Sequence, residues 1–190
     1  MRYVLASKSP RRKELMKLIS SDYLIATEDI DEEKSYVLSP IDAVKDIAKR
    51  KGEEVYKSYQ DDLVISADTI VVIDDEIIGK PKDEKDAYNI LKKLSDRTHY
   101  VYTAFALFYK GQVLVDLVST SVTFNKLSDE LIYSYIESKS PMDKAGGYGI
   151  QDNKKYPIIK NIIGSYDNVV GFPVKEIKER INELISSCGS

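Results

Sequence analysis

Two long strand-like segments joined by a short turn constrain the fold of this chain more than any other feature. Residues 99–109 and 112–124 flank Lys110-Gly111, and this arrangement predicts an antiparallel hairpin. Elsewhere, helix-like and strand-like segments alternate along the sequence. We therefore predict an α/β fold with a mixed, twisted sheet flanked by helices, because a purely parallel sheet would not contain a hairpin.

The remaining elements are predicted from periodicity and capping residues, and a turn is expected at Asp74-Asp75. Strands are predicted near 2–6, 22–27, 63–73 and 156–163, and helices near 9–19, 39–56, 83–94, 128–138 and 173–187. No linker, low-complexity segment or internal repeat interrupts this pattern. A chain of 190 residues is large enough for a substantial core, so we predict a single domain over residues 1–190.

Composition excludes several classes of protein. The net charge of −3 argues against a chain that coats nucleic acid or an anionic membrane, so phosphate recognition would need a local cluster of cations. Cys188 is the single cysteine, which excludes a disulfide framework and favours a reducing, cytoplasmic setting. The sequence has no signal-peptide pattern and no apolar run long enough to span a membrane. We expect a cytoplasmic protein without membrane or nucleic-acid partners.

The segment Ser7-Lys8-Ser9-Pro10-Arg11-Arg12 joins a predicted strand directly to a predicted helix. Ser9 is a favourable N-cap, and Pro10 suits the first helical position. Arg11 and Arg12 crowd the end of the helix dipole that favours anions. The junction is therefore either a solvated basic patch or a binding site for a phosphate group.

An acidic residue lies within the most apolar strand. The segment Leu63–Ile73 is predicted to be buried on both faces, yet Asp68 lies at its centre. An ionised carboxylate in such surroundings is costly unless it is paired, binds a metal or serves as an acid or base. A structural aspartate held by backbone hydrogen bonds is the alternative. We favour a functional role for Asp68.

A lysine shares the predicted inward face of the helix after Ser39. Apolar residues recur at helical spacing along that helix, and Lys51 falls on the same stripe. Either the lysine extends along the apolar surface into solvent, or it places a positive charge in a cleft. The stripe consists of Ile41, Val44, Ala48 and Val55.

Two glycine-containing segments are candidate ligand loops. Gly79-Lys80-Pro81 is not a P-loop, but it would hold Lys80 on a tight turn if it is more than a surface connection. The segment 143–151 contains three glycines that allow close backbone approach to a ligand. Its last residue, Gln151, supplies an amide able to read a base edge, whereas a plain flexible loop is the alternative.

These segments together resemble the Maf proteins, which are nucleoside triphosphate pyrophosphatases. The resemblance extends from about residue 3 to residue 173, and six motifs occur in the family's order. The versions at Ala67-Asp68-Thr69 and Gly147–Gln151 resemble the branch that acts on dTTP and UTP. The motifs are Ser7-x-Ser9-Pro10-Arg11-Arg12, Ala67-Asp68-Thr69, Gly79-Lys80-Pro81, Arg97-Thr98-His99, Ala145–Gln151 and Gly164-Ser165-Tyr166 with Val169-Val170-Gly171-x-Pro173.

The resemblance implies an elongated α/β fold with a central cleft, related to the inosine triphosphate pyrophosphatases. It also implies cleavage between the α and β phosphates, which yields a nucleoside monophosphate and pyrophosphate. A divalent cation, Mg²⁺ or Mn²⁺, is the implied cofactor. The implied partners are a nucleoside triphosphate substrate and a second copy of the chain in a homodimer.

The resemblance also assigns roles to individual residues. Asp68 matches the family's proton acceptor, and Glu32 matches an acidic residue associated with the metal, which Asp68 would also contact. Glu33 is an alternative to Glu32 because it lies directly beside it. Phosphate binding is implied for Ser9, Arg12, Lys51 and Lys80, and substrate choice for Arg11, Thr69 and Gln151.

The chain departs from the family pattern at two positions. Asp96 occupies a position that is usually glycine, and Gly52 occupies one that is usually alanine. Neither change removes a predicted catalytic group.

Two other functions compete with the enzyme hypothesis. The first is a nucleotide-binding regulator of cell division that does not turn its ligand over. Asp68 and Glu32 argue against it, since binding alone does not require acidic groups beside phosphates. The second is nucleic-acid binding through the basic segment near Arg11 and Arg12, which the acidic net charge disfavours.

Overall fold

The computed structural model describes residues 1–189, which divide into two compact units. Unit 1 comprises residues 1–68 and 103–118 together with the chain from Gly171 onward, and unit 2 comprises residues 69–102 and 119–170. Three long strands contribute residues to both units: β3 (Leu63–Ile73), β5 (Thr98–Tyr109) and β6 (Gln112–Phe124). The single domain predicted for residues 1–190 stays a prediction.

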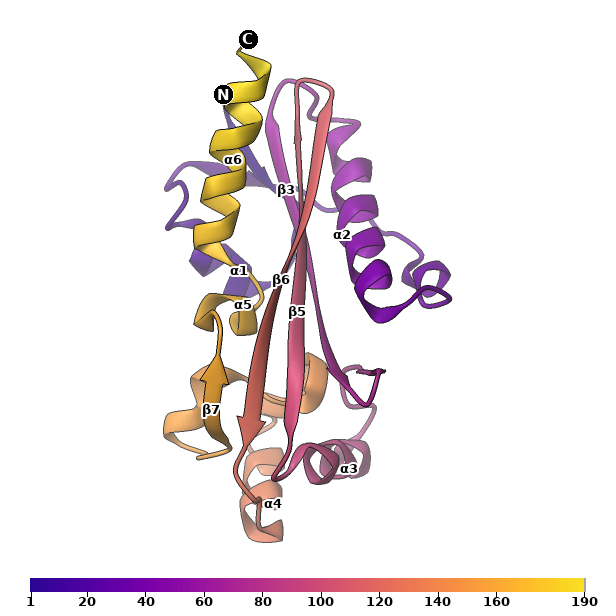
Figure 1. Cartoon of the computed structure of the whole chain (residues 1–190), viewed down its shortest axis with the longest axis vertical. Helices are drawn as coiled ribbons and strands as arrows, with labels where there is room; N and C mark the ends of the chain where they lie inside the picture. Colours follow the sequence, from indigo (N-terminus) through magenta and orange to yellow (C-terminus); the bar gives the residue numbers. More distant parts are fainter. Residues whose placement is uncertain (190) are drawn as a thin grey trace. The chain divides into compact units, whose positions relative to one another are not determined.

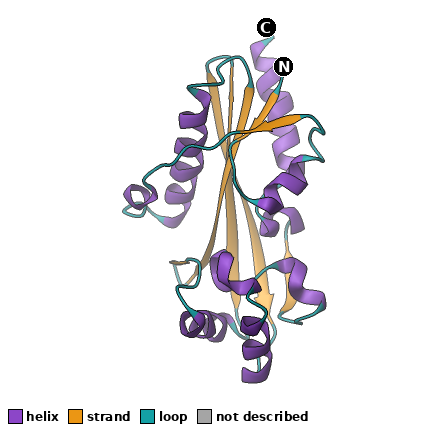
Figure 2. Ribbon diagram, turned by 180° about the vertical axis from the view of Figure 1, so that it is seen from behind, coloured by secondary structure: helices purple, strands orange, loops and turns teal. Residues whose placement is uncertain are grey.

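Unit 1 is built on a sheet in which β1 (Tyr3–Leu5) pairs in parallel with β2 (Tyr23–Ile25) and with β3. The strand order in this unit is β2-β1-β3-β5-β6. Helices α2 and α6 cover opposite faces of these strands (Figures 1 and 2). The helices of the unit are α1 (Pro10–Met16), α2 (Pro40–Tyr56), α6 (Val174–Cys188) and the 3₁₀ helix η1 (Glu32–Ser35).

Alternation of side chains along β3 determines which residues face which helix. Ile65 and its same-face neighbours pack with α6, whereas Val64 packs with Val55 of α2. The buried Ser66 hydroxyl donates a 2.6 Å hydrogen bond to the carbonyl oxygen of Ala48 in α2. Because side chains two residues apart share a face, β3 directs Asp68 toward α2 as well.

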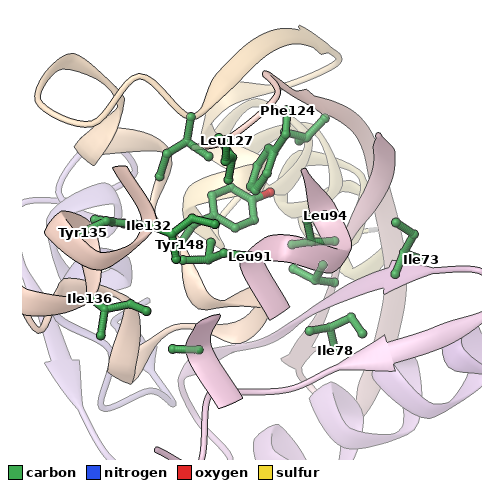
Figure 3. Close-up of a cluster of buried hydrophobic side chains, with 14 of the residues drawn as sticks. Ile73, Ile78, Leu91, Leu94, Phe124, Leu127, Ile132, Tyr135, Ile136 and Tyr148 are labelled. Carbon is green, nitrogen blue, oxygen red and sulfur yellow. The ribbon is translucent and has the colours of Figure 1, made fainter. Parts of the chain in front are cut away.

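Unit 2 surrounds its own hydrophobic core. Strand β4 (Glu76–Ile78) is antiparallel to β3, and β7 (Ile159–Ile163) is antiparallel to β6. The core packs Leu91, Phe124, Ile132 and Tyr148 against one another (Figure 3). The helices are α3 (Glu84–Leu94), α4 (Asp129–Glu137), α5 (Tyr166–Val170) and the 3₁₀ helices η2 (Ser140–Asp143), η3 (Ala145–Gly147) and η4 (Ile150–Lys154).

The predicted fold class is confirmed: the sheet contains both parallel and antiparallel pairs and is flanked by helices. Lys110 and Gly111 have φ angles of 47° and 76°, which is the left-handed geometry that a tight two-residue hairpin requires. Asp74 and Asp75 adopt φ angles of 53° and 59° in the second predicted turn. Within residues 1–189, no helix combines the length and apolar character needed to cross a membrane.

Some predicted details are wrong. The first helix ends at Met16 rather than near residue 19, and Leu18, which lies just beyond it, is 57% exposed. Ile41 was placed on the inward face of α2, but it lies in the first turn and is 39% exposed. The segment 143–151 is not a plain loop, because it contains η3 and parts of η2 and η4.

Candidate active site

The junction between β1 and α1 positions the Arg12 side chain. Ser9 is the N-cap, and its hydroxyl accepts a 3.3 Å hydrogen bond from the Arg12 backbone N–H. The Arg12 guanidinium donates from Nε to the Gly171 carbonyl oxygen at 2.9 Å and from a terminal nitrogen to the Ser7 hydroxyl at 3.5 Å. Helix α1 has only seven residues. The positive charge of this junction therefore comes from the arginines more than from a helix dipole.

Lys51 brings two carboxylates of unit 1 together. Its Nζ lies 2.8 Å from Oε1 of Glu32 and 3.2 Å from Oδ1 of Asp68. The lysine side chain is 25% exposed and that of Asp68 13%, so both groups are largely withdrawn from water. The sequence left open that Lys51 only extends into solvent. This alternative is wrong, because the ammonium group is paired with Glu32 and Asp68.

The short helix η1 directs Glu32 and Glu33 to different surroundings. Its N-cap, Asp31, accepts a 3.2 Å hydrogen bond from the Glu33 backbone N–H. Glu32 is directed to Lys51, whereas Glu33 is exposed. The structure therefore brings Glu32, and not its neighbour, to the lysine and Asp68.

The electrostatics of this cluster favour a proton-accepting carboxylate. Burial raises the pKa of Asp68 above the ordinary value, while the nearby charges of Lys51 and Arg12 oppose that rise and the charge of Glu32 adds to it. Burial also lowers the pKa of the Arg12 guanidinium, an effect that the charge of Asp68 opposes. A carboxylate that is more basic than usual and is flanked by cations suits proton abstraction beside an anionic ligand.

In unit 2, the Gly79-Lys80-Pro81 turn lies against the glycine-rich segment. The Gly146 backbone N–H donates a 3.1 Å hydrogen bond to the Gly79 carbonyl oxygen. A Cβ added at Gly147 would meet the Pro81 ring at 3.4 Å, which indicates a close approach of the two backbones. Lys80 and Gln151 are both exposed and are carried by these neighbouring segments.

A polar network that the sequence analysis missed supports the segment carrying Gln151. The Tyr135 hydroxyl accepts a 2.9 Å hydrogen bond from the Gly149 backbone N–H and donates one of 2.7 Å to Asp152. Asp152 also accepts from the Ser140 hydroxyl at 2.6 Å. No sequence signal indicates where the Tyr135 hydroxyl points.

The predicted site residues thus fall into two sets. Unit 1 groups Arg12, Glu32, Lys51 and Asp68 through contacts or charge, with Ser9 and the half-buried Arg11 at the adjoining helix start. Unit 2 contains Thr69, Lys80 and Gln151, and it brings the Lys80 turn against the glycine-rich segment. The roles assigned to these residues stay predictions.

Comparison with known proteins identifies the family. The family model described as Maf-like protein matches residues 2–184 of this chain. The chain belongs to the Maf family. The resemblance that its motifs indicated is therefore confirmed.

Proteins with similar sequences share the name dTTP/UTP pyrophosphatase. A protein named dTTP/UTP pyrophosphatase from Clostridium botulinum (strain Alaska E43 / Type E3) is 42% identical over 189 residues, covering 97% of this chain and 100% of that protein. One of the same name from Thermococcus onnurineus (strain NA1) is 44% identical over 181 residues, covering 95% and 96%. A solved structure of a HAM1 protein from Coxiella burnetii aligns with a TM-score of 0.47 at 13% identity, covering 96% of this chain and 99% of that one.

The structure explains both departures from the Maf motif pattern. A Cβ at Gly52 would overlap the side chains of Phe108 and Ser66, so α2 approaches the sheet too closely in this chain for the usual alanine. Asp96, where glycine is usual, has a φ angle of 58°, a left-handed conformation that glycine adopts without strain. Aspartate is among the few other residues that tolerate it.

The donor set of this Maf site fits a hard divalent cation. Oxygens of Glu32 and Asp68 both lie within 3.2 Å of the Lys51 Nζ, so both carboxylates face the ammonium group of this lysine. Within residues 1–189, no group of three or more His, Cys, Asp or Glu side chains forms a metal cage. One or two carboxylates completed by substrate phosphates and water are typical of Mg²⁺ sites, and Glu32 and Asp68 could supply those carboxylates.

Proposed function

We propose that this protein hydrolyses dTTP and UTP to the nucleoside monophosphate and pyrophosphate. The observation that carries the proposal is the cluster of Arg12, Glu32, Lys51 and Asp68, in which cations flank a buried carboxylate of raised pKa. Maf relatives named dTTP/UTP pyrophosphatase match almost the whole chain at about 40% identity, which supports this substrate and reaction.

In this proposal, Asp68 is the proton acceptor. It takes a proton from a water molecule as the water oxygen forms a bond to the α-phosphorus. The bond between the α-phosphorus and the oxygen bridging to the β-phosphorus breaks, and pyrophosphate leaves with the bonding electrons. Arg12 and Lys51 stabilise the negative charge that develops on the phosphate oxygens, which is the main contribution a protein makes to such transfers.

The implied cation would be held by Glu32 and Asp68. When bound, Mg²⁺ or Mn²⁺ would neutralise phosphate charge and lower the pKa of water. Ser9 and Lys80 are proposed to bind phosphate, and Arg11, Thr69 and Gln151 to influence substrate choice. The side-chain amide of Gln151 offers one acceptor and two donors, which complements the carbonyl and N–H edge of uracil or thymine.

Pyrophosphate release from a panel of nucleoside triphosphates, with Mg²⁺ and with Mn²⁺, tests the proposal. We expect turnover of dTTP and UTP by the natural sequence and none by Asp68→Asn, which should still bind nucleotide. Asp61→Asn is the matched control because Asp61 is exposed just before β3 and belongs to neither set of site residues. Activity retained in Asp68→Asn would reject the role of Asp68.

If folded protein releases no pyrophosphate from any nucleotide of the panel, the result would instead support the alternative function, a regulator that binds nucleotide without hydrolysing it. That alternative is not favoured, because the matching Maf relatives carry enzyme names. A cytoplasmic location and a homodimer are also proposed. The free thiol of Cys188 is consistent with a reducing compartment.

A further inference from the structure

The helix that supplies Lys51 also holds the segment that supplies Glu32. Arg50 precedes Lys51 in α2, and its guanidinium donates a 2.8 Å hydrogen bond to the carbonyl oxygen of Asp31. The same guanidinium donates to the hydroxyl of Ser35. Asp31 is the N-cap of η1 and Ser35 is its last residue. The Arg50 guanidinium therefore forms hydrogen bonds at both ends of η1, the helical turn that contains Glu32.

Asp46, one turn earlier in α2, completes this arrangement. Its carboxylate accepts a 2.9 Å hydrogen bond from Arg50 Nε and a 2.7 Å hydrogen bond from the Ser35 hydroxyl. Ser35 is fully buried, and the Arg50 side chain is only 25% exposed. These hydrogen bonds lower the pKa of Asp46 and keep it ionised. A charged network that is partly withdrawn from water fixes geometry better than an exposed ion pair does.

We propose that Arg50 and Asp46 are positioning residues that hold η1 so that Glu32 stays against Lys51. Glu32 itself is 41% exposed, and its carboxylate is held by the 2.8 Å contact with the lysine and by a hydrogen bond with Tyr36, the residue that follows η1. The inference rests on the proposed role of Glu32 in pyrophosphate release. Residues that orient a metal-side carboxylate typically change metal affinity or activity by about 10- to 100-fold when they are removed.

Arg50→Ala is the direct test, with Lys49→Ala as the matched control because Lys49 is the exposed neighbour on the same helix. We expect kcat for dTTP to fall about 10- to 100-fold in Arg50→Ala, with a smaller change in KM. Hydrogen exchange of the amides of residues 31–38 should accelerate at least about tenfold. Lys49→Ala should change none of these quantities, and Asp46→Asn should move them in the same direction as Arg50→Ala.

A double mutant separates positioning from general stabilisation. If Arg50 acts through Glu32, adding Arg50→Ala to Glu32→Gln should cause no further loss of kcat. Losses that multiply in the double mutant, or exchange that is unchanged in Arg50→Ala, would overturn the inference. If the natural sequence releases no pyrophosphate, the proposed function fails first. The exchange measurement still reports whether Arg50 holds η1.

Discussion

The Nζ of Lys51 lies 3.2 Å from Oδ1 of Asp68, so the charge of the ammonium group acts directly on the aspartate carboxyl group. Burial raises the pKa of Asp68, and the lysine is the largest opposing influence. In Lys51→Met the opposing charge is gone, and the pKa of Asp68 should rise further. Carbon-detected NMR titration of the aspartate carboxyl groups measures this directly, with Lys49→Met as the control. An unchanged Asp68 titration would contradict the pairing.

The pH dependence of catalysis follows from the same shift. The base must be deprotonated, so kcat/KM should fall as the pH drops through the pKa of Asp68. Because that pKa is raised, the acidic limb should lie above about pH 4, the range of an ordinary aspartate. A pH profile of kcat/KM for dTTP checks this. A limb at or below the ordinary range would argue for a different base.

Gln151 should determine base preference rather than the rate of the chemical step. Gln151→Ala removes the amide proposed to read the pyrimidine, and we expect KM for dTTP and UTP to rise about tenfold with little change in kcat. Lys154→Ala is a suitable control, since Lys154 is exposed on the same 3₁₀ helix. Steady-state kinetics with all canonical nucleotides measures the outcome. An unaltered nucleotide profile would remove Gln151 from the proposal.

Gly52→Ala should destabilise the fold. The added methyl group would overlap Phe108 and Ser66, and overpacking of this kind costs about 1–3 kcal/mol of unfolding free energy. Chemical denaturation compares this variant with Gly79→Ala, where an added Cβ would meet nothing within 4 Å. Equal stability of the two variants would show that α2 can move away from the sheet at no cost.

The only histidine should make stability depend on pH. His99 is fully buried, its Nε2 and the Tyr148 hydroxyl share a 2.6 Å hydrogen bond, and burial lowers its pKa from 6.5 to about 4. Between these values the unfolded chain binds a proton that the folded chain does not. The contribution of neutral His99 to the free energy of unfolding is therefore fully present above about pH 6.5. It should decrease by up to about 3 kcal/mol as the pH falls toward 4.

Unfolding free energies of the natural sequence and of His99→Gln, measured between pH 7 and pH 4, check this. The variant should be less stable at pH 7 but should lose less stability on acidification. Parallel curves for the two proteins would exclude the histidine as the cause.

Local sequence signals predicted much of the fold because they act over a few residues. The bounds of β3 and β6 followed from apolar runs and turn residues, and the N-cap Ser9 marked where the first helix begins. The mixed character of the sheet followed from the Lys110-Gly111 hairpin.

Long-range contacts were beyond such signals. Lys51 could be placed on a helix face, but its meeting with Glu32 depends on how η1 folds back onto α2, and no periodicity encodes that. The same holds for Arg50, whose partners Asp31 and Ser35 lie outside α2. Hydroxyl and guanidinium contacts of this kind can be identified only in the three-dimensional structure.

The core of unit 1 combines segments that are far apart in the sequence, and this has a consequence for biosynthesis. Its core packs Leu5 of β1 and Met16 of α1 together with Ile177 and Ile181 of α6, which lie near the other end of the chain. The ribosome produces the first of these residues long before the last, so the face of β1 that packs against α6 stays uncovered until α6 has been synthesised. Exposed apolar strands in nascent chains are prone to aggregation. This protein is therefore expected to complete its N-terminal core only after α6 has been synthesised.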